Sequence, residues 1–535
     1  MDRLLAGRFV PLLLTTSLVG VACGDDAPGN AEQTTTESSE TGDGDGDGDG
    51  DGDGEPTGDG DGDGDGDGEP TGDGDGDGDE WGYWEPGKML PTSREPNARG
   101  FLDRRGLIHA HSVHSHDACD DMPKDDQGNY DAMCDRDFRE GLCRARHDFV
   151  FLTDHSDSFA STEYPETLLH RPLFGDQLVE QDGSPIANWT GCLTFDRGDS
   201  GNAPFVPALI QAGSESATMP IGLPAHVGAT VDERLAALGD GSAEGISTFA
   251  EAGAVVLVAH TEDWTAQELT DLPLDGFEMY NLHANLFLNI AAAGLLLSKL
   301  GDRDALPHSS LVLLPLISED PAYLDTWSAV LASGTRKLTT MGTDCHRNTF
   351  PQELPDGQRI DSYERMMKWF SNHLLVESTD VDDPQAFGPA ELHEALEAGR
   401  LFGVFELLGL PEGFDVHAEQ NGEILEIGGE PSLAEGSVTL RVVAPIVAAR
   451  DPATPAPVIQ LRLLRATPTS WEEVAFVSGL EGAVGPLELA VDEPGAYRAE
   501  VRILPKHLEA WLGDYGDLVD QSFVWIYANP IYVRD

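Results

Sequence analysis

Residues that commonly bind metal ions stand at the ends of several short apolar runs in this chain. In a strand, side chains two residues apart lie on the same face, so His109 and His111 are expected to point together, as are Asp344 and His346. Ligands delivered from the ends of several strands build the active site of a β/α barrel. The pattern therefore predicts a metallohydrolase. The residues concerned are His109, His111, Asp154, His155, Glu215, His226, His260, Asp344 and His346.

The chain from about residue 98 to 412 is expected to form the domain that positions these residues. Its first part alternates short apolar runs with helical stretches, for example the run 311–314 followed by a helix over 321–333. Such alternation is typical of α/β folds. Helices over 361–375 and 389–400 are expected to complete the domain.

A different pattern begins near residue 413, where helical periodicity fades. The segment 413–535 contains β-rich runs separated by turn residues, which is typical of a small antiparallel β-sandwich. We expect this sandwich to be a packing domain or lid, or else a module that contacts glycan or protein. The β-rich runs are 438–443, 458–463, 497–501 and 523–527.

The first 23 residues are expected to be an export signal. Residues 1–23 have a basic start, an apolar run too short to be a stable membrane anchor, and a small-residue end. The segment from Leu18 to Cys23 resembles a bacterial lipoprotein signal, although Gly20 stands where that pattern has leucine. We therefore expect an exported protein, lipid-anchored through Cys23 in the bacterial cell envelope (periplasm or cell surface). An ordinary small-x-small cleavage site, giving a secreted protein, is the alternative.

Residues 24–97 are expected to be a disordered acidic linker. The stretch 41–80 repeats Gly-Asp and has no apolar residue that could offset the entropy lost on ordering. Residues 24–80 hold 23 acidic and no basic residues, out of a formal charge of −64 for the whole chain. The remainder is still strongly acidic. This argues against nucleic acid as a partner, because binding to phosphate backbones needs a basic surface.

Four of the six cysteines lie between residues 119 and 192. Disulfides persist in exported proteins, so we expect one or two bridges there, with a connectivity that the sequence leaves open. Cys345 stands between two ligand-type residues of a strand, so its side chain is expected to point away from them as a buried thiol.

The order of the motifs resembles that of the PHP (polymerase and histidinol phosphatase) family. The chain presents His-x-His, an acidic loop, Thr-Asp-His, Gly-Ser-Glu, an isolated histidine, Ala-His and Thr-Asp-Cys-His in that order. The segment from Phe277 to Asn281 also resembles the strand before the family's last ligands. The resemblance covers roughly residues 105–350. It implies a metal-dependent phosphoesterase with a distorted (β/α)7 barrel.

The resemblance also implies three divalent metal ions. In the loop after His-x-His, Asp117 is favoured as a ligand because Ser-His-Asp looks like the family's Ser-Asp with one added residue, which leaves His114 and His116 as rim residues. Mixed imidazole and carboxylate ligands suit zinc, manganese or iron better than magnesium or calcium. The implied sets are His109, His111, Glu215 and Asp344 for one ion, Glu215, His226 and His260 for a second, and Asp117, His155 and His346 for a third.

The expected reaction is hydrolysis of a small phosphorylated substrate by a metal-bridging hydroxide. A bound divalent ion lowers the pKa of water from near 16 to about 7. Glu215 and Asp344 are the expected catalytic carboxylates, and Arg347 is expected to stabilise the charge that develops on the phosphate. Asp154 is expected to be either an outer hydrogen-bond acceptor of the site or a helix cap.

Two other functions are compatible with the same ligands. An amidohydrolase would apply the metals to a C–N or C–O bond, and a surface binding module would keep the metals without turnover. The complete ligand set favours an enzyme, because a decayed site would be expected to have lost some of these groups.

Overall fold

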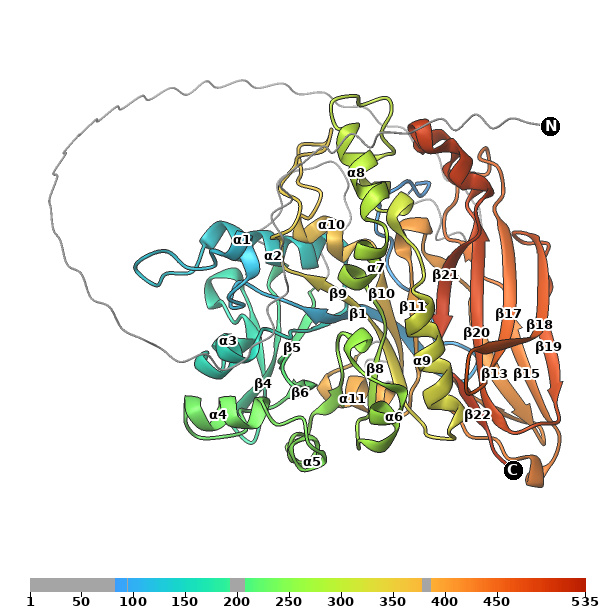
Figure 1. Ribbon diagram of the computed structural model, residues 1–535, viewed down its shortest axis with the longest axis horizontal. Coiled ribbons are helices and arrows are strands. Elements are labelled where there is room, and N and C mark those ends of the chain that lie inside the picture. Colours follow the sequence, from blue (N-terminus) through green and yellow to red (C-terminus); the bar gives the residue numbers. More distant parts are fainter. Residues whose placement is uncertain (1–81, 94, 193–206, 378–385) are drawn as a thin grey trace, which may run out of the picture. The chain divides into compact units, whose positions relative to one another are not determined.

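The computed structural model describes residues 82–93, 95–192, 207–377 and 386–535 (Figure 1). The expected export signal at 1–23, with Cys23, and the Gly-Asp repeat lie outside these residues. All described residues belong to one compact unit. The linker ends earlier than expected, because Trp84 and Leu90 are buried in the core and the Trp84 backbone N–H donates to the Ala449 carbonyl (2.7 Å).

Five parallel strands form the centre of the fold. β1 (Phe101–Ala110) pairs with β2 (Phe149–Phe151) on one side and with β9 (Leu338–Cys345) on the other. β5 (Leu209–Gly213) continues beyond β2, and β8 (Gly276–Asn281) continues beyond β9. Because these strands run in the same direction, their carboxyl ends meet at one edge of the sheet.

Two further strands, joined by antiparallel pairing, extend this arrangement. β6 (Met219–Leu223) pairs with β5, and β7 (Val255–Leu257) pairs with β6, so β7 runs in the direction of β5. Among the described residues no strand ladder joins β7 to β8, so the named strands form a mixed α/β sheet and no closed barrel.

Helices follow most of the central strands. The expected helix at 321–333 is confirmed as α9 (Pro321–Ala332), which begins after the capping residue Asp320 with proline in its first turn, a favoured position. α9 contacts β8 on one side and the C-terminal strands on the other (Figure 1). The other α-helices are α1 (Ala118–Asp121), α2 (Ala132–Ala145), α3 (Ser156–Ser161), α4 (Val231–Leu238), α5 (Ala243–Glu251), α6 (Ala266–Asp271), α7 (Leu282–Leu288), α8 (Ile290–Ser298), α10 (Tyr363–Met367) and α11 (Pro389–Glu397).

Two of the expected elements are wrong. The apolar run 311–314, which the α/β alternation implied to be a strand, instead spans the end of one 3₁₀ helix (Ser309–Leu311), a turn, and the start of another (Leu314–Leu316). The expected helix over 361–375 ends early at Met367, and β10 (Ser371–Glu377) follows it. A short apolar run can form either a helix or a strand. Residues 371–377 form a strand here because they pair with β1.

The central sheet continues without interruption into the C-terminal segment. β10 pairs with β11 (Leu401–Val404), and β11 pairs with β21 (Phe523–Ala528). The sheet therefore crosses the expected domain boundary at 412/413. It continues through β20 (Gly495–Leu504) and β17 (Val458–Ala466) to β18 (Trp471–Leu480), with β22 (Ile531–Val533) paired to β20 and the hairpin of β3 (Gln177–Gln181) and β4 (Ser184–Trp189) at the other end.

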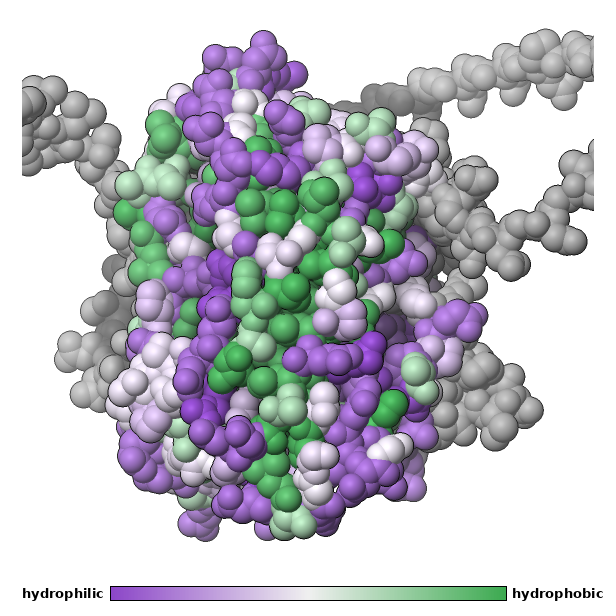
Figure 2. Space-filling model, turned by 90° about the vertical axis from the view of Figure 1, so that its right-hand side faces the viewer, coloured by the Kyte–Doolittle hydropathy of each residue, from purple (hydrophilic) through white to green (hydrophobic). Residues whose placement is uncertain are grey.

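A separate antiparallel sheet lies in the C-terminal segment, as expected for part of a sandwich. β15 (Val438–Val443) alternates buried and partly buried residues, which shows that one face packs on the core. Figure 2 shows an apolar band on the side where Figure 1 places β17, β18 and β19. The sheet contains β14 (Glu423–Leu425), β13 (Asp415–Gln420), β15 and β19 (Leu487–Val491), and β12 (Pro411–Glu412) pairs with β16 (Ile446–Val447) nearby.

The cysteine predictions are confirmed. Cys119 is bonded to Cys134 and Cys143 to Cys192, so the segment between the first motifs carries two disulfides. Cys345 is a buried free thiol. Burial raises its pKa to about 12, which keeps the thiol protonated and unreactive at neutral pH.

Candidate metal centre

Eight of the nine predicted ligands come together at the carboxyl ends of the central strands. His109 and Asp344 lie in the last residues of β1 and β9, and His111 and His346 follow those strands directly. His155, Glu215 and His260 follow β2, β5 and β7, and Asp117 lies in the loop after β1. Parallel strands thus collect residues that are up to 237 positions apart in the chain.

The backbone at three of these ligands departs from regular strand geometry. His109, His260 and Asp344 have φ values of 76°, 49° and 50°, in the left-handed region that L-residues rarely adopt. The pairing of β1 with β9 also shifts register between Ile108 and Ala110. Bulges and strained residues re-aim side chains at functional sites, so simple alternation along a strand does not decide where these ligands point.

One group of ligands is His111, Asp117, His155 and His346, whose ligand atoms all lie within 4.8 Å of one another. Asp117 Oδ2 lies 3.2 Å from His155 Nε2 and 3.0 Å from His346 Nε2. The rings of His111 and His346 stack with their centroids 3.8 Å apart. The second group is His109, Glu215, His260 and Asp344, with the same spread of ligand atoms.

Two carboxylates of the second group also reach the first group. Glu215 Oε1 lies 2.9 Å from His260 Nε2, while its Oε2 lies 3.1 Å from His111 Nε2. Asp344 Oδ1 lies 3.3 Å from both His109 Nε2 and His346 Nδ1. The structure thus places Glu215 between ligands of both groups, as expected, and arranges the donors as two groups of four instead of the three sets implied by the resemblance.

The orientation of the imidazoles fits metal ions at these groups. His109 Nδ1 bonds to Glu278 (2.6 Å), His111 Nδ1 to Ser115 Oγ (3.1 Å) and His346 Nδ1 to the Asp344 carbonyl (3.0 Å). In each case Nε2 faces the group. Metal-binding histidines are held in this way, with the outer N–H donated to an oxygen. His109 Nε2 and His111 Nε2 lie only 3.2 Å apart, so the two groups adjoin at these two rings.

Burial and charge shift the pKa values of these groups strongly. Burial alone would lower the pKa of His260, but its hydrogen bonds to Glu215 and Glu262 outweigh burial and raise the pKa to about 12. Burial likewise opposes protonation of His346, while the Asp344 and Asp117 carboxylates raise its pKa to about 9. Burial would raise the pKa of Glu215, but the surrounding histidines hold it well below its usual range. Without metal, protons on the histidines are therefore expected to offset the negative charge of the carboxylates.

Metal loading is expected to release protons and to weaken as pH falls. The neighbouring carboxylates raise the pKa values of His346 and His260 above 7, so we expect both rings to be protonated in the metal-free protein at pH 7. A metal must displace these protons, so the apparent affinity should rise from pH 6 to about pH 9. Calorimetric titration with zinc in two buffers of different ionisation enthalpy should show release of at least one proton per protein at pH 7. An equal heat in both buffers would contradict this expectation.

Glu278 belongs to the site although it was not among the predicted ligands. The side chain is fully buried in β8, and its Oε1 accepts from His109 Nδ1. Its Oε2 accepts from the His260 backbone N–H (3.2 Å) and from Asn281 Nδ2 (3.2 Å). A charged residue in the middle of the apolar strand 276–281 is the signal that marks it, because buried carboxylates need partners.

Gly342 makes room for this carboxylate. A Cβ atom built at Gly342 would lie 1.9 Å from Glu278 Oε1, far inside contact distance. This close approach gives a physical reason for glycine in the Gly342-Thr343-Asp344 motif.

Asp154 acts as an outer hydrogen-bond acceptor. It accepts from the backbone N–H (2.6 Å) and the hydroxyl (2.8 Å) of Ser112, directly after His111. Its side chain does not cap α3. Burial raises its pKa to about 6, although the Ser112 hydrogen bonds oppose this shift. Asp154 therefore ties the loop after β1 to the segment that carries His155.

His226 lies outside both groups, which corrects its expected role as a ligand. Its Nε2 bonds to the Thr162 carbonyl (2.8 Å), and its ring packs against Phe159 and Tyr164. An isolated histidine in a loop is not positioned by the end of a strand.

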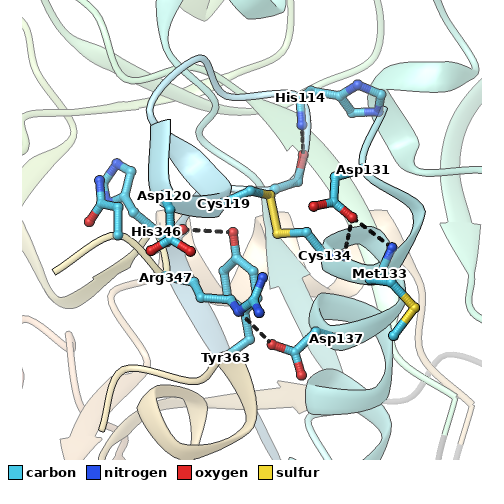
Figure 3. Close-up of a disulfide and its surroundings, with 12 residues drawn as sticks. His114, Cys119, Asp120, Asp131, Met133, Cys134, Asp137, His346, Arg347 and Tyr363 are labelled. Carbon is cyan, nitrogen blue, oxygen red and sulfur yellow. Dashed lines mark hydrogen bonds and ion pairs between the residues drawn. A yellow bond between two sulfur atoms is a disulfide. The ribbon is translucent and has the colours of Figure 1, made fainter. Parts of the chain in front are cut away.

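Arg347 does not point towards the metal-binding groups, where it was expected to stabilise charge on the phosphate. Its Nε pairs with Asp137 Oδ2 on α2 at 3.1 Å (Figure 3).

The two other histidines of the first loop have different surroundings. His116 lies on the rim, with a side chain 52% exposed that pairs with Asp157. His114 is buried against Tyr130 and is not a rim residue.

No protein-family model matches the sequence, and neither a curated protein nor a solved structure is similar to it at a significant level. Among the described residues, no helix has both the length and the apolar character needed to span a membrane.

Proposed function

We propose that the protein is a metal-dependent phosphoesterase of PHP type. The observation that carries the proposal is the pair of adjacent histidine and carboxylate groups with Glu215 and Asp344 between them. Two neighbouring divalent ions are a recurrent arrangement in enzymes that cleave phosphate esters. We take the two groups as the sites for two ions, and the third ion implied by the resemblance is tested by the metal stoichiometry.

The arrangement of strands supports a PHP-type barrel. The backbone N–H of Glu278 donates to the Val258 carbonyl (2.9 Å), that of Val258 to Gly276 (3.2 Å) and that of Asp275 to Val256 (2.9 Å). These bonds link the end of β7 to β8, the two ends of the seven-strand run β7-β6-β5-β2-β1-β9-β8. We propose that this run is the distorted (β/α)7 barrel.

The differences in exposure indicate where a substrate enters. The side chains of His155 and His260 are each 26% exposed, whereas those of His109 and His111 are fully buried. The groups therefore open to solvent on the side of His155 and His260. Divalent ions in both groups would bring four positive charges against three ligand carboxylates, those of Asp117, Glu215 and Asp344, while the Glu278 carboxylate lies behind His109 on the buried side. An anionic phosphate that approaches from the open side would therefore meet the ions first.

The residues of the chain have distinct roles in this reaction. When bound, the metal ions would lower the pKa of water to about 7 and so supply a nucleophile at neutral pH. Glu215 and Asp344 hold the two groups together, and Glu278 fixes the ring of His109. The buried rings of His109 and His111 close one side of the site to bulk water. The ester therefore approaches from the side of His155 and His260.

The function is tested by elemental analysis of purified protein together with a screen of esters. We expect about two or three bound zinc, manganese or iron ions and hydrolysis of phosphomonoesters, phosphodiesters or nucleotides that stops after metal removal and returns when metal is added. Hydrolysis of amides or carboxylic esters alone would favour an amidohydrolase. Bound metal with no hydrolysis of any of these would favour a binding module.

We also propose that a lipid on Cys23 anchors the protein in the cell envelope, with the Gly-Asp repeat as spacer. The support is the sequence from Leu18 to Cys23 and the acidic low-complexity stretch that follows it. Replacing Cys23 with alanine should move most of the protein from the membrane fraction to the soluble fraction on cell fractionation. Unchanged membrane retention would contradict the anchor.

A further inference from the structure

We propose that the Cys119–Cys134 disulfide positions Asp117 as a metal ligand. This inference rests on the metal groups of the proposed function. Asp117 is the one ligand of the two groups that no strand end places, since it lies seven residues after β1 in a loop. Cys119, which is two residues after Asp117, is joined by the disulfide to Cys134 (Figure 3).

The loop has a conformation that needs to be held in place. Within the short turn labelled α1, Cys119, Asp120 and Asp121 have φ values of 59°, 61° and 60°, so this turn is left-handed and not a regular α-helix, and it contains no glycine. L-residues adopt this conformation as single residues and not as runs, so neighbouring structure must impose it here.

One side of the loop is fastened to the segment that supplies another ligand of the same group. The Cys119 backbone N–H donates to the His346 carbonyl (3.1 Å), and the Asp120 N–H donates to the Arg347 carbonyl (3.2 Å). Asn348 Nδ2 donates to the Asp117 carbonyl (2.8 Å). The Asp117 loop and the His346 segment therefore form one hydrogen-bonded unit.

The disulfide fastens the other side to a helix. Cys134 lies in the first turn of α2, whose start is capped by Asp131 through the backbone N–H groups of Met133 and Cys134. α2 packs against α10, and Cys119 and Cys134 are both buried. The bridge is thus a covalent link between a rigid helix and a loop whose backbone conformation is unfavourable.

Two other side-chain contacts fasten the loop, and the first joins near neighbours in the sequence: Ser115 Oγ donates to Asp117 Oδ1 (3.0 Å). Asp120 pairs with Arg359 through both carboxylate oxygens, and its side chain is 38% exposed. An ion pair with one partly exposed partner opens more readily than a covalent bridge. Without the bridge, we expect the loop to sample other conformations in which Asp117 leaves His155 and His346.

The second disulfide provides a matched control. Cys143–Cys192 joins the end of α2 to the segment after β4, and its buried sulfurs pack with Phe174. Cys143 and Cys192 belong to neither group of ligands, and the nearest ligand in the sequence, His155, lies 12 residues from Cys143.

The test measures binding of cobalt and zinc to the full chain by equilibrium dialysis and elemental analysis, with the visible spectrum of cobalt as a second readout. The variant Cys119→Ser/Cys134→Ser should lose about 10–100-fold in affinity at one class of site, the range typical of outer-ligand losses, and keep the other class unchanged. Cys143→Ser/Cys192→Ser should keep both classes. Equal binding by wild type and Cys119→Ser/Cys134→Ser would overturn the proposal.

A double-mutant cycle shows whether the bridge acts through Asp117. Asp117→Ala should weaken the same class of site, and adding it to Cys119→Ser/Cys134→Ser should cause no further loss, because coupled changes are not additive. Additive losses would overturn the proposal. If the serine pair does not fold, Cys119→Ala/Cys134→Ala replaces it, and failure of both pairs to fold while the control folds would show a general structural role instead. Wild-type protein that binds no metal would refute the proposed function itself.

Discussion

Replacing Glu215 with glutamine is expected to lower metal binding and the proposed phosphoesterase activity together. One oxygen of Glu215 lies against His260, and the other lies within 3.6 Å of His109, His111 and His155. Glutamine keeps the shape but removes the negative charge and turns an amide N–H₂ towards one set of ligands. Loss of a hydrogen-bond partner behind a metal ligand typically lowers metal affinity about 10–100-fold. We expect a larger loss of metal affinity here, because this carboxylate contacts both groups.

The size of the effect is judged against two other variants. His260→Ala removes one neutral donor from one group, so it should lower metal content less than Glu215→Gln does. Glu163→Gln removes a carboxylate that pairs with Arg234 outside the site and should leave metal content unchanged. The measurements are elemental analysis and hydrolysis of an aryl phosphate. A full metal complement and wild-type activity in Glu215→Gln would refute both the shared role of this residue and the PHP interpretation.

Replacing Glu278 is expected to have the second largest effect. Its carboxylate fixes the ring of His109 and the backbone of His260, so both ligands lose their support when the charge is removed. We expect Glu278→Gln to lower metal affinity about 10–100-fold, as measured for carboxylates behind metal-binding histidines. Titration of metal-free protein with zinc, followed by competition with a chelator, measures the change.

Gly342→Ala provides an independent check on the same contact. The added methyl group occupies the position of Glu278 Oε1 and should displace the carboxylate without changing its charge. Its effect on zinc affinity should have the same direction as that of Glu278→Gln. Alanine at the exposed Gly294 in α8, in contrast, should leave zinc affinity unchanged, because no atom lies within 4 Å of its Cβ position and its backbone is not left-handed. Normal zinc affinity in both Glu278→Gln and Gly342→Ala would show that Glu278 does not support the site.

The chemistry of the site could be predicted from the sequence to a large extent. Histidine and carboxylate residues directly after apolar runs mark strand ends, and eight of the nine predicted ligands do meet in the structure. The disulfide-bonded segment and the buried thiol of Cys345 followed from cysteine spacing and strand alternation. These features depend on local patterns, which a single chain displays directly.

Other features depend on contacts between distant segments. His226 looked like a ligand because of its place in the motif order, but its ring packs in a pocket of Phe159 and Tyr164. Glu278 lies in an otherwise apolar strand, and its role depends on a contact with His109, which is 169 residues away in the sequence. The sheet runs across the expected boundary at 412/413 because β11 pairs with β21, a pairing that no local pattern reveals.

The sequence by itself determined which residue types are available for metal binding and that strand ends present them. Only the tertiary structure decided how they are grouped. Left-handed backbone at His109, His260 and Asp344 turns these side chains away from simple strand alternation, and sheet pairing brings Glu215 and Asp344 between the two sets of histidines. Such conformations are unfavourable in isolation and persist because the surrounding packing and hydrogen bonds impose them.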